Sequence, residues 1–353
     1  MAYSTIIKPS DYFNTKLYTG NGSTNAQTGV GFQPDWVWLK GRSNTGSNKL
    51  MDAVRGSSSS LCSNNSNAAE GADYFSSFDS NGFTVNGTSN DINANGQTYV
   101  GWNWKAGTTS GITTNGSSNI TPSGYSFNAT SKFSVIKWSG TGVDGAYLPH
   151  GLGVAPSVAI IKKTSASEEW VMFHIGLGTN ARQEYLRLNN TAAKVTTSGI
   201  WYSQLPTATN IRLSNDSWVN ASGSNYVGYF FADTAGYQKH SSYVGNGNAD
   251  GTFVYTGFKP AFVLIKDRTR AESWYIFDNR RLGYNGGMAD LIPNTTAAES
   301  GSSATLLDFL SNGFKLTGTT DHLNGSGEAF VYSAFAESPF VANSGESVPT
   351  TAR

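Results

Sequence analysis

The sequence has a single cysteine, Cys62, among its 353 residues, which excludes an internal disulfide framework. Charged residues are scarce: Asp, Glu, Lys and Arg make up 14% of the chain, against roughly 25% in an average globular protein. The 24 basic and 24 acidic residues cancel, so no excess of one sign points to nucleic acid or an anionic membrane surface. We therefore predict that the protein binds no nucleic acid.

Long apolar runs are missing as well. No stretch approaches the ~18 residues of a membrane-spanning helix, which predicts no membrane insertion. The N-terminal segment MAYSTIIKPSDYF lacks the charged start and the long apolar core of a signal peptide. We expect a protein that is made in the cytoplasm without a signal peptide; if it ends up outside a cell, a route other than secretion, such as lysis, takes it there.

Turn-forming and aromatic residues are abundant instead. The chain has 40 glycines, and 13% of its residues are aromatic, which argues against disorder. Short apolar runs of 4–8 residues stand between Gly, Asn, Ser and Pro, and no stretch keeps the 3.6-residue period of an amphipathic helix. This pattern predicts an all-β protein.

One sequence unit occurs three times. The segments DWVWLK, SVAIIK and AFVLIK each follow a proline, and each ends in a lysine six residues after that proline. A polar residue stands 18 residues after each proline, and a Gly-x-x-aromatic-Val element closes each copy. The shared positions include Pro34, Pro156 and Pro260; Lys40, Lys162 and Lys266; and Asp52, His174 and Asp278.

Copies of this length are large enough to have cores of their own. We predict three tandem β-sandwich or jelly-roll-like units of about 100 residues, similar to lectin folds. The predicted units are residues 1–106, 133–233 and 234–340, with a polar linker or long loop at 107–132 and a polar tail at 341–353.

The tryptophans of the repeat are predicted to be structural. In a strand, Trp36 and Trp38 lie on one face while Val37 and Leu39 lie on the other, so both faces are apolar. The sister copies place Val158 and Ile160, then Phe262 and Leu264, where Trp36 and Trp38 stand. Because only apolar character is kept, we assign these positions to a core that is covered by a loop, a sister unit or a neighbouring chain. Trp170 and Trp274 are also assigned to the core.

Aromatic residues outside the repeat register are candidates for ligand binding. They are Trp201 and Tyr202 in SGIWYSQLP, Trp218 in NDSWVN and Tyr284 in RLGYNGG. Flat rings beside Asn, Ser and Gln are suited to stacking on sugars. The alternative is that each ring packs beneath its own loop.

Motifs for metals and catalysis are weak. Asp91, Asn93 and Asn95 match the start of a calcium loop, but Trp102 stands where the loop needs a bidentate Glu. A β-turn explains them better, and no other cofactor is expected. GTGVDG at 140–145 lacks a following helix, and no nucleophile, metal or paired-carboxylate pattern emerges. We predict that the protein is not an enzyme.

Residues 18–106 resemble a repeat found in virion proteins of tailed phages of marine bacteria and cyanobacteria. The resemblance rests on LYTGNGSTNAQTGVGFQPDWVWLKGR, DAVRG, FDSNGFTVNG and GQTYVGWNWKAG. It is weaker in the second copy, while the third keeps TGFKPAFVLIKDR and SNGF. The resemblance implies a β-rich component of the phage particle and no catalytic residues.

Together these features predict a phage virion structural protein, a tail fibre or particle-surface appendage that binds host-surface glycan as receptor. We expect it to be a homo-oligomer that contacts other virion proteins. The alternative is a capsid or tail decoration (cement) protein without a receptor role. A polysaccharide depolymerase is a third reading, but the short-period repeats of a parallel β-helix are missing.

Overall fold

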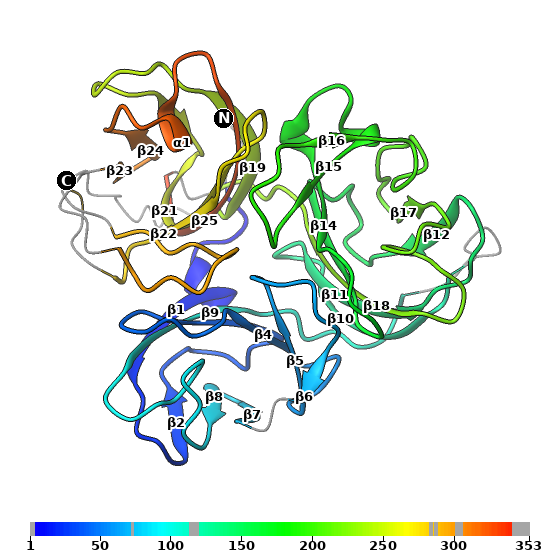
Figure 1. The fold of residues 1–353 in the computed structure, drawn as a ribbon, viewed down its shortest axis with the longest axis horizontal. Helices are drawn as coiled ribbons and strands as arrows, with labels where there is room; N and C mark the ends of the chain where they lie inside the picture. The colour runs from blue at the N-terminus through cyan, green and yellow to red at the C-terminus, as the bar shows by residue number, and fades with distance from the viewer. Residues whose placement is uncertain are drawn as a thin grey trace.

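The computed structural model describes residues 4–71, 74–112, 120–281, 285, 289–300 and 306–340. In these residues every pair of neighbouring strands is antiparallel, and the single α-helix, α1, covers only Asp321–Asn324. The predicted all-β fold class is confirmed. Figure 1 shows three lobes around a common centre, each with a large sheet toward the centre and a small sheet toward the outside. The predicted tail at 341–353 lies outside the described residues.

The first lobe contains β1–β9. Its large sheet has the order β1-β9-β3-β4-β5-β6, and its small sheet has the order β2-β8-β7. The strands are β1 (Phe13–Thr19), β2 (Asn25–Thr28), β3 (Trp36–Gly41), β4 (Lys49–Asp52), β5 (Ser59–Cys62), β6 (Glu70–Gly71), β7 (Phe75–Asp79), β8 (Gly82–Val85) and β9 (Thr98–Trp104), after the 3-10 turn η1 (Pro9–Asp11).

The second lobe contains β10–β18. Its large sheet runs β10-β11-β18-β13-β14-β15-β16, and its small sheet pairs β12 with β17. The elements are β10 (Pro122–Asn128), β11 (Phe133–Ser139), β12 (Ala146–Pro149), β13 (Val158–Lys163), β14 (Val171–His174), η2 (Ile175–Leu177), η3 (Ala181–Gln183), β15 (Glu184–Arg187), β16 (Val195–Thr196), β17 (Asn210–Leu213) and β18 (Asn225–Phe231).

The third lobe contains β19–β25. Its large sheet runs β19-β25-β21-β22, and its small sheet runs β20-β24-β23. The strands are β19 (Gln238–Val244), β20 (Phe253–Tyr255), β21 (Phe258–Asp267), β22 (Trp274–Asp278), β23 (Leu307–Leu310), β24 (Gly313–Leu316) and β25 (Ala329–Pro339). The central strand order β9-β3-β4 of the first lobe recurs as β18-β13-β14 and β25-β21-β22.

The segment 107–132, predicted as a polar linker or long loop, contributes a strand instead. β10 pairs with β11 at the edge of the large sheet of the second lobe. The Ser126 hydroxyl on β10 donates to the buried carboxylate of Asp35, 2.6 Å away in the first lobe. Of the seven residues of β10 only Ser126 is buried, so this strand needs few apolar side chains. Its Gly, Ser and Asn content therefore resembles that of a loop.

The two apolar faces of β3 pack against different partners. Val37 and Leu39 face the small sheet of their own lobe, where they join a core with Phe83. Trp36 and Trp38 face the centre of the molecule, and the Trp36 ring stacks on Tyr229 of the second lobe at 4.5 Å. One apolar core therefore extends through all three lobes. The sequence allowed a loop, a sister unit or a neighbouring chain to cover Trp36 and Trp38, and the structure shows that the sister units cover them.

Each lobe also extends an arm onto the next lobe, and the three contacts form a closed ring. The arms are residues 62–69, 187–194 and 293–299, which reach the second, third and first lobe in turn. The equivalent backbone hydrogen bonds are Ala69 N to Thr164 O (2.9 Å), Lys194 N to Arg268 O (3.0 Å) and Glu299 N to Arg42 O (2.8 Å). Side-chain donors directly before β14, at the start of β22 and directly before β4 complete the ring: Trp170 Nε1 to Cys62 O, Trp274 Nε1 to Arg187 O and Asn48 Nδ2 to Thr295 O.

The recurring polar position forms a second ring of contacts. The carboxylate of Asp52 accepts a 2.8 Å hydrogen bond from the Tyr229 hydroxyl of the second lobe. His174 Nε2 lies 3.1 Å from the Tyr332 carbonyl of the third lobe. Trp102 Nε1 of the first lobe donates to Asp278 at 3.0 Å. Three equivalent residues thus join each lobe to the next, always in the same direction around the centre.

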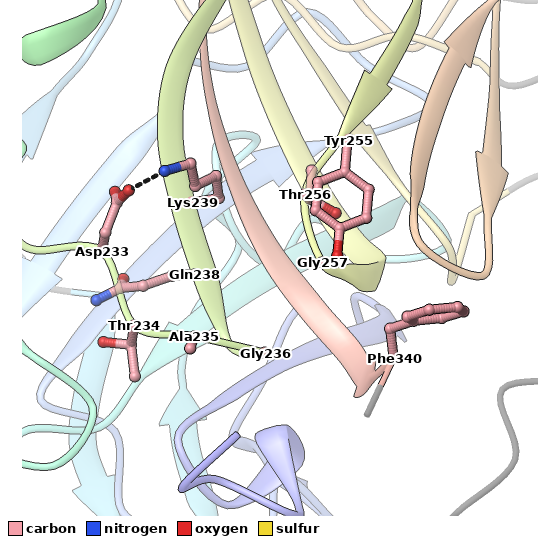
Figure 2. Close-up of a pocket in the computed structure, with 10 residues that line it drawn as sticks. All are labelled: Asp233, Thr234, Ala235, Gly236, Gln238, Lys239, Tyr255, Thr256, Gly257 and Phe340. Atoms are coloured by element: carbon pink, nitrogen blue, oxygen red, sulfur yellow. Dashed lines mark hydrogen bonds and ion pairs between the residues drawn. The ribbon is translucent and has the colours of Figure 1, made fainter. Parts of the chain in front are cut away.

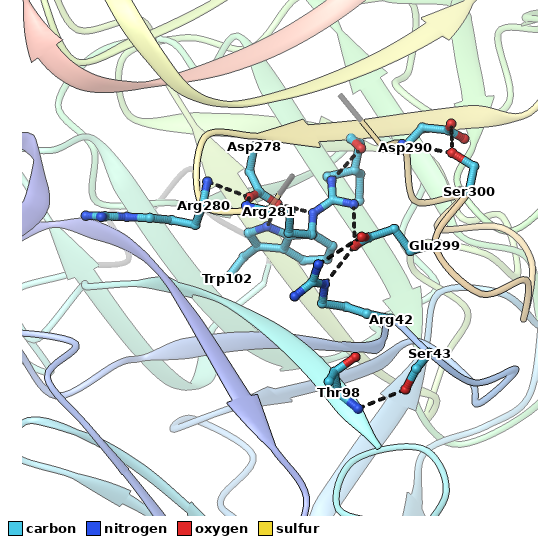
Figure 3. A network of polar contacts seen from close by, with 11 residues as sticks. Arg42, Ser43, Thr98, Trp102, Asp278, Arg280, Arg281, Asp290, Glu299 and Ser300 are labelled. Carbon is cyan, nitrogen blue, oxygen red and sulfur yellow. Dashed lines mark hydrogen bonds and ion pairs between the residues drawn. The ribbon is translucent and has the colours of Figure 1, made fainter. Parts of the chain in front are cut away.

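The joint between the third and first lobes is the most highly charged. Figure 3 shows Glu299 between two arginines. Its carboxylate accepts two hydrogen bonds from Arg42 of the first lobe, at 2.8 and 2.9 Å, and contacts Arg281 at 3.2 Å. Arg281 also pairs with Asp278 at 2.6 Å. Because the side chains of Glu299 and Arg281 are 9% and 1% exposed, solvent screens these pairs weakly.

Replacing Glu299 by alanine is expected to lower the free energy of unfolding by about 1.5–3 kcal/mol, the usual effect of losing hydrogen bonds to charged groups. Urea unfolding measures this change. Glu70→Ala is the matched control, because Glu70 is exposed and pairs with Lys49 at 3.2 Å, so its loss should cost less than about 1 kcal/mol. Equal effects of the two substitutions would contradict a stabilising role of the joint.

Candidate functional site

The structure separates the four aromatic candidates. Trp201 is fully buried, its Nε1 donates to Glu184 O at 2.9 Å, and its ring packs edge-on against Phe173. No ligand reaches it, so its assignment as a binding residue is wrong, and the packing alternative holds. Trp218 is half-buried and lies edge-on to Tyr185 at 5.5 Å. Tyr284 lies outside the described residues.

The calcium candidates belong to a turn. Asn93 is fully buried, and its Nδ2 donates to the carbonyls of Ser23 and Gly87. Its Oδ1 accepts from Asn21 N. Asn220 and Asn324 hold the equivalent turns of the other lobes in the same way. Since Asn93 stabilises this turn, we derive no calcium site from Asp91, Asn93 and Asn95. Among the described residues no group of three His, Cys, Asp or Glu side chains is arranged to hold a metal.

The recurring residues lie in the interior. Pro34, Pro156 and Pro260 are buried. Trp36, Trp38, Trp170 and Trp274 are each at most 1% exposed. Burial without an opening to solvent suits packing and does not suit ligand binding.

An open hollow in the third lobe brings together side chains suited to binding. We call it the Tyr255 hollow; its volume is about 470 Å³, and its lining includes Asp233, Thr234, Lys239, Tyr255 and Phe340. Figure 2 shows the two aromatic rings along one side and Asp233 with Lys239 along the other. Tyr255 is 52% exposed and Phe340 is 37% exposed, so two aromatic rings present apolar surface to one hollow.

The polar side of the Tyr255 hollow offers both donors and acceptors. Lys239 Nζ and Asp233 Oδ2 form a 2.5 Å ion pair that is partly exposed. The other carboxylate oxygen of Asp233 accepts from His240 N at 2.9 Å, which fixes the side chain. Gln238, at the base, donates from Nε2 to the carbonyls of Ser131 and Ala232.

The Tyr255 hollow is specific to the third lobe. Tyr255 pairs with Gly313 of β24, whereas the residue that pairs with the equivalent Gly82 of β8 in the first lobe is Thr28, which has no ring. The outward direction of Tyr255 follows from the strand period, because β20 alternates exposed, buried, exposed over Phe253–Tyr255. The sequence candidates did not include Tyr255.

The structure is an all-β, three-lobed protein with an open hollow that is lined by aromatic and polar side chains. In the described part of the chain, no helix is both long and apolar enough to cross a bilayer. The chain belongs to the DUF7483 family, a domain of unknown function whose family model matches residues 8–339. That single match spans all three lobes. Searches of curated proteins and of solved structures found no match.

Proposed function

We propose that the chain is a non-catalytic structural protein of a phage particle, a tail fibre or particle-surface appendage, and that it binds host-surface glycan in the Tyr255 hollow. The observation that carries the binding proposal is the pairing of two exposed rings with an exposed ion pair across one open hollow. The resemblance of residues 18–106 to phage virion repeats and the uncharged polar composition support the structural part. Contacts with other virion proteins and with further copies belong to the same proposal.

The chemistry of a sugar fits this surface. A pyranose presents C–H groups on one face and hydroxyl groups around its rim. The rings of Tyr255 and Phe340 offer apolar faces for the former. Hydroxyl groups both donate and accept, so Asp233 and Lys239 can each bind one. The closed ring of lobe contacts holds these side chains on a rigid frame, which limits the entropy lost on binding.

Tyr255→Gly tests the binding site. Because Tyr255 is 52% exposed on the edge strand β20, the variant should fold and should lose about tenfold or more in affinity for a glycan found by array screening, the effect of losing one aromatic contact. Isothermal titration measures the change. Phe253→Gly is the matched control, because Phe253 is 45% exposed on the same strand but does not line the hollow. Unchanged affinity of Tyr255→Gly would overturn the site.

The location of the chain tests the structural part. Antibody labelling of intact particles should detect the chain at the surface, with the Tyr255 hollow accessible. A chain held between capsid subunits with the hollow covered would instead favour the decoration protein.

A further inference from the structure

The small sheet of the second lobe lacks a strand that its sisters have. It pairs only β12 with β17, whereas the small sheets of the first and third lobes have three strands. The missing strand corresponds to β7 and β23. At that point of the chain, between β16 and β17, the second lobe has the irregular segment 197–206. Where the first and third lobes have this strand, the second lobe has a second hollow on its outside.

This second hollow, the Tyr202 hollow, is lined almost entirely by hydrogen-bonding side chains. Its volume is about 490 Å³, and its lining includes Asp144, Ser198, Tyr202, Ser203, Asn215 and Asp216. None of the described residues that line it is Lys or Arg. Tyr202 is the sequence candidate that the structure does place at an open surface.

The ring of Tyr202 is held in position. The Arg212 guanidinium lies 4.1 Å from the ring centroid, and Arg212 Nε donates to Gly145 O at 3.0 Å. Tyr202 and Ser203 both have positive φ angles, 50° and 52°. Two consecutive non-glycine residues in this region are uncommon, and such backbone occurs preferentially at ligand clamps.

The hollow offers acceptors in excess of donors. Asp144 is exposed, and its Oδ1 accepts one long hydrogen bond, 3.4 Å, from Asn215 N. Asp216 accepts from Trp218 N at 2.8 Å through one oxygen. The Arg212 guanidinium lies against the rings of Tyr202 and Tyr147, and Arg212 is absent from the lining. A ligand with ammonium or hydroxyl donors therefore suits this hollow, and a carboxylated one is repelled by it.

We propose that the Tyr202 hollow is a second saccharide site, selective for amino or neutral sugars over acidic ones. The flat Tyr202 ring packs on the apolar face of the sugar, and the carboxylates of Asp144 and Asp216 accept hydrogen bonds from its amine or hydroxyl groups. This site is independent of the Tyr255 hollow, which lies on another lobe and contains a lysine.

The test is titration of the full chain at neutral pH with three probes: a β1,4-linked glucosamine tetramer, cellotetraose and an oligogalacturonate. The glucosamine tetramer should bind best, cellotetraose less tightly and the oligogalacturonate least. Tyr202→Asn removes the ring but keeps a residue that tolerates positive φ, and it should weaken binding of both favoured probes about tenfold. Asp144→Asn, at an exposed residue with little risk to folding, should weaken the glucosamine tetramer more than cellotetraose.

Two controls separate this site from the first. Tyr255→Gly should leave the binding of these probes to the Tyr202 hollow unchanged. Asp250→Asn, which removes an exposed carboxylate of the third lobe, should leave it unchanged as well. The proposal is overturned if none of the probes binds, if the oligogalacturonate binds as tightly as the other two, or if Tyr202→Asn and Asp144→Asn leave the affinities unchanged. Loss of binding in Tyr255→Gly alone would assign the sugar to the third lobe.

Discussion

Asp52→Ala is expected to lower the free energy of unfolding by about 3–5 kcal/mol, the usual cost of breaking a buried ion pair. Asp52 is fully buried, and its Oδ2 lies 2.5 Å from Arg55 Nε and 2.8 Å from the Tyr229 hydroxyl. The Arg55 side chain is only 4% exposed. Removing the carboxylate therefore leaves the buried guanidinium without its counter-charge, although it still donates to Leu50 O and the Ser59 hydroxyl, at the joint between the first and second lobes.

The second lobe shows an uncharged alternative at the same position. It has His174 for Asp52 and Leu177 for Arg55, so it loses the anion and the cation together. The double variant Asp52→His/Arg55→Leu should therefore be more stable than Asp52→Ala. The Tyr229 hydroxyl can accept a hydrogen bond from an imidazole N–H as readily as it donates one to a carboxylate.

The third lobe supplies the matched comparison. The double variant Asp278→His/Arg281→Leu should not recover stability in the same way. His174 Nδ1 accepts from Gly176 N, which leaves its Nε2–H as a donor. An imidazole at position 278 with the same geometry would face Trp102 Nε1, which only donates. Urea unfolding of all three variants measures these differences in the free energy of unfolding. Equal stability of the two double variants would contradict the assignment of partners.

The all-β fold and the interior position of β3 could be predicted because they depend on patterns within one copy. Alternation places Trp36 and Trp38 on one face, and their replacement by other apolar residues in the sister copies indicates a core. The partners across the lobe joints could not be predicted. Tyr229, Ser333 and Trp102 occupy equivalent positions in the closing strands and can each donate a hydrogen bond, but they differ in size and in whether they can also accept one. Which of them meets Asp52 depends on the direction in which the three lobes follow one another around the centre.

The candidate sites show the same limit. Trp201 and Tyr202 are adjacent in the sequence, yet one is buried and the other lines a hollow. Because both residues belong to one loop, its composition cannot distinguish them. Only the three-dimensional course of the chain determines which ring is buried and which lines the hollow. Tyr255 differs, because its exposure follows from the alternation of side chains along β20. The strand period therefore contained more information about this site than the composition of loops.

Three buried histidines are expected to make the protein sensitive to acid. Burial lowers the pKa of His150 and of His240 to about 4 and that of His174 to about 3. His174 and His240 lie at the boundary of the second and third lobes, with ring centroids 6.3 Å apart, so a charge on one opposes a charge on the other. Of the charged groups nearby, Asp233 favours protonation of both rings, while Lys239 and Arg268 oppose it. His240 Nδ1 also lies 2.9 Å from the Ser333 hydroxyl.

The sign of the effect follows from proton binding. Unfolded histidine titrates near pH 6.5, whereas the folded rings stay neutral until the pH falls to about 4 or below. Between these values the unfolded chain binds more protons than the folded protein. Each unit by which the pH decreases therefore lowers the free energy of unfolding by about 1.4 kcal/mol per histidine. The full stability is present above pH 6.5 and falls as the pH decreases.

Urea unfolding at a series of pH values should show this slope, and His240→Gln should reduce the slope by about the contribution of one histidine. His322→Gln, at a half-buried ring stacked on Tyr275, should reduce it less, and an unchanged slope in His240→Gln would show that His240 is not among the groups that make the joint acid-sensitive.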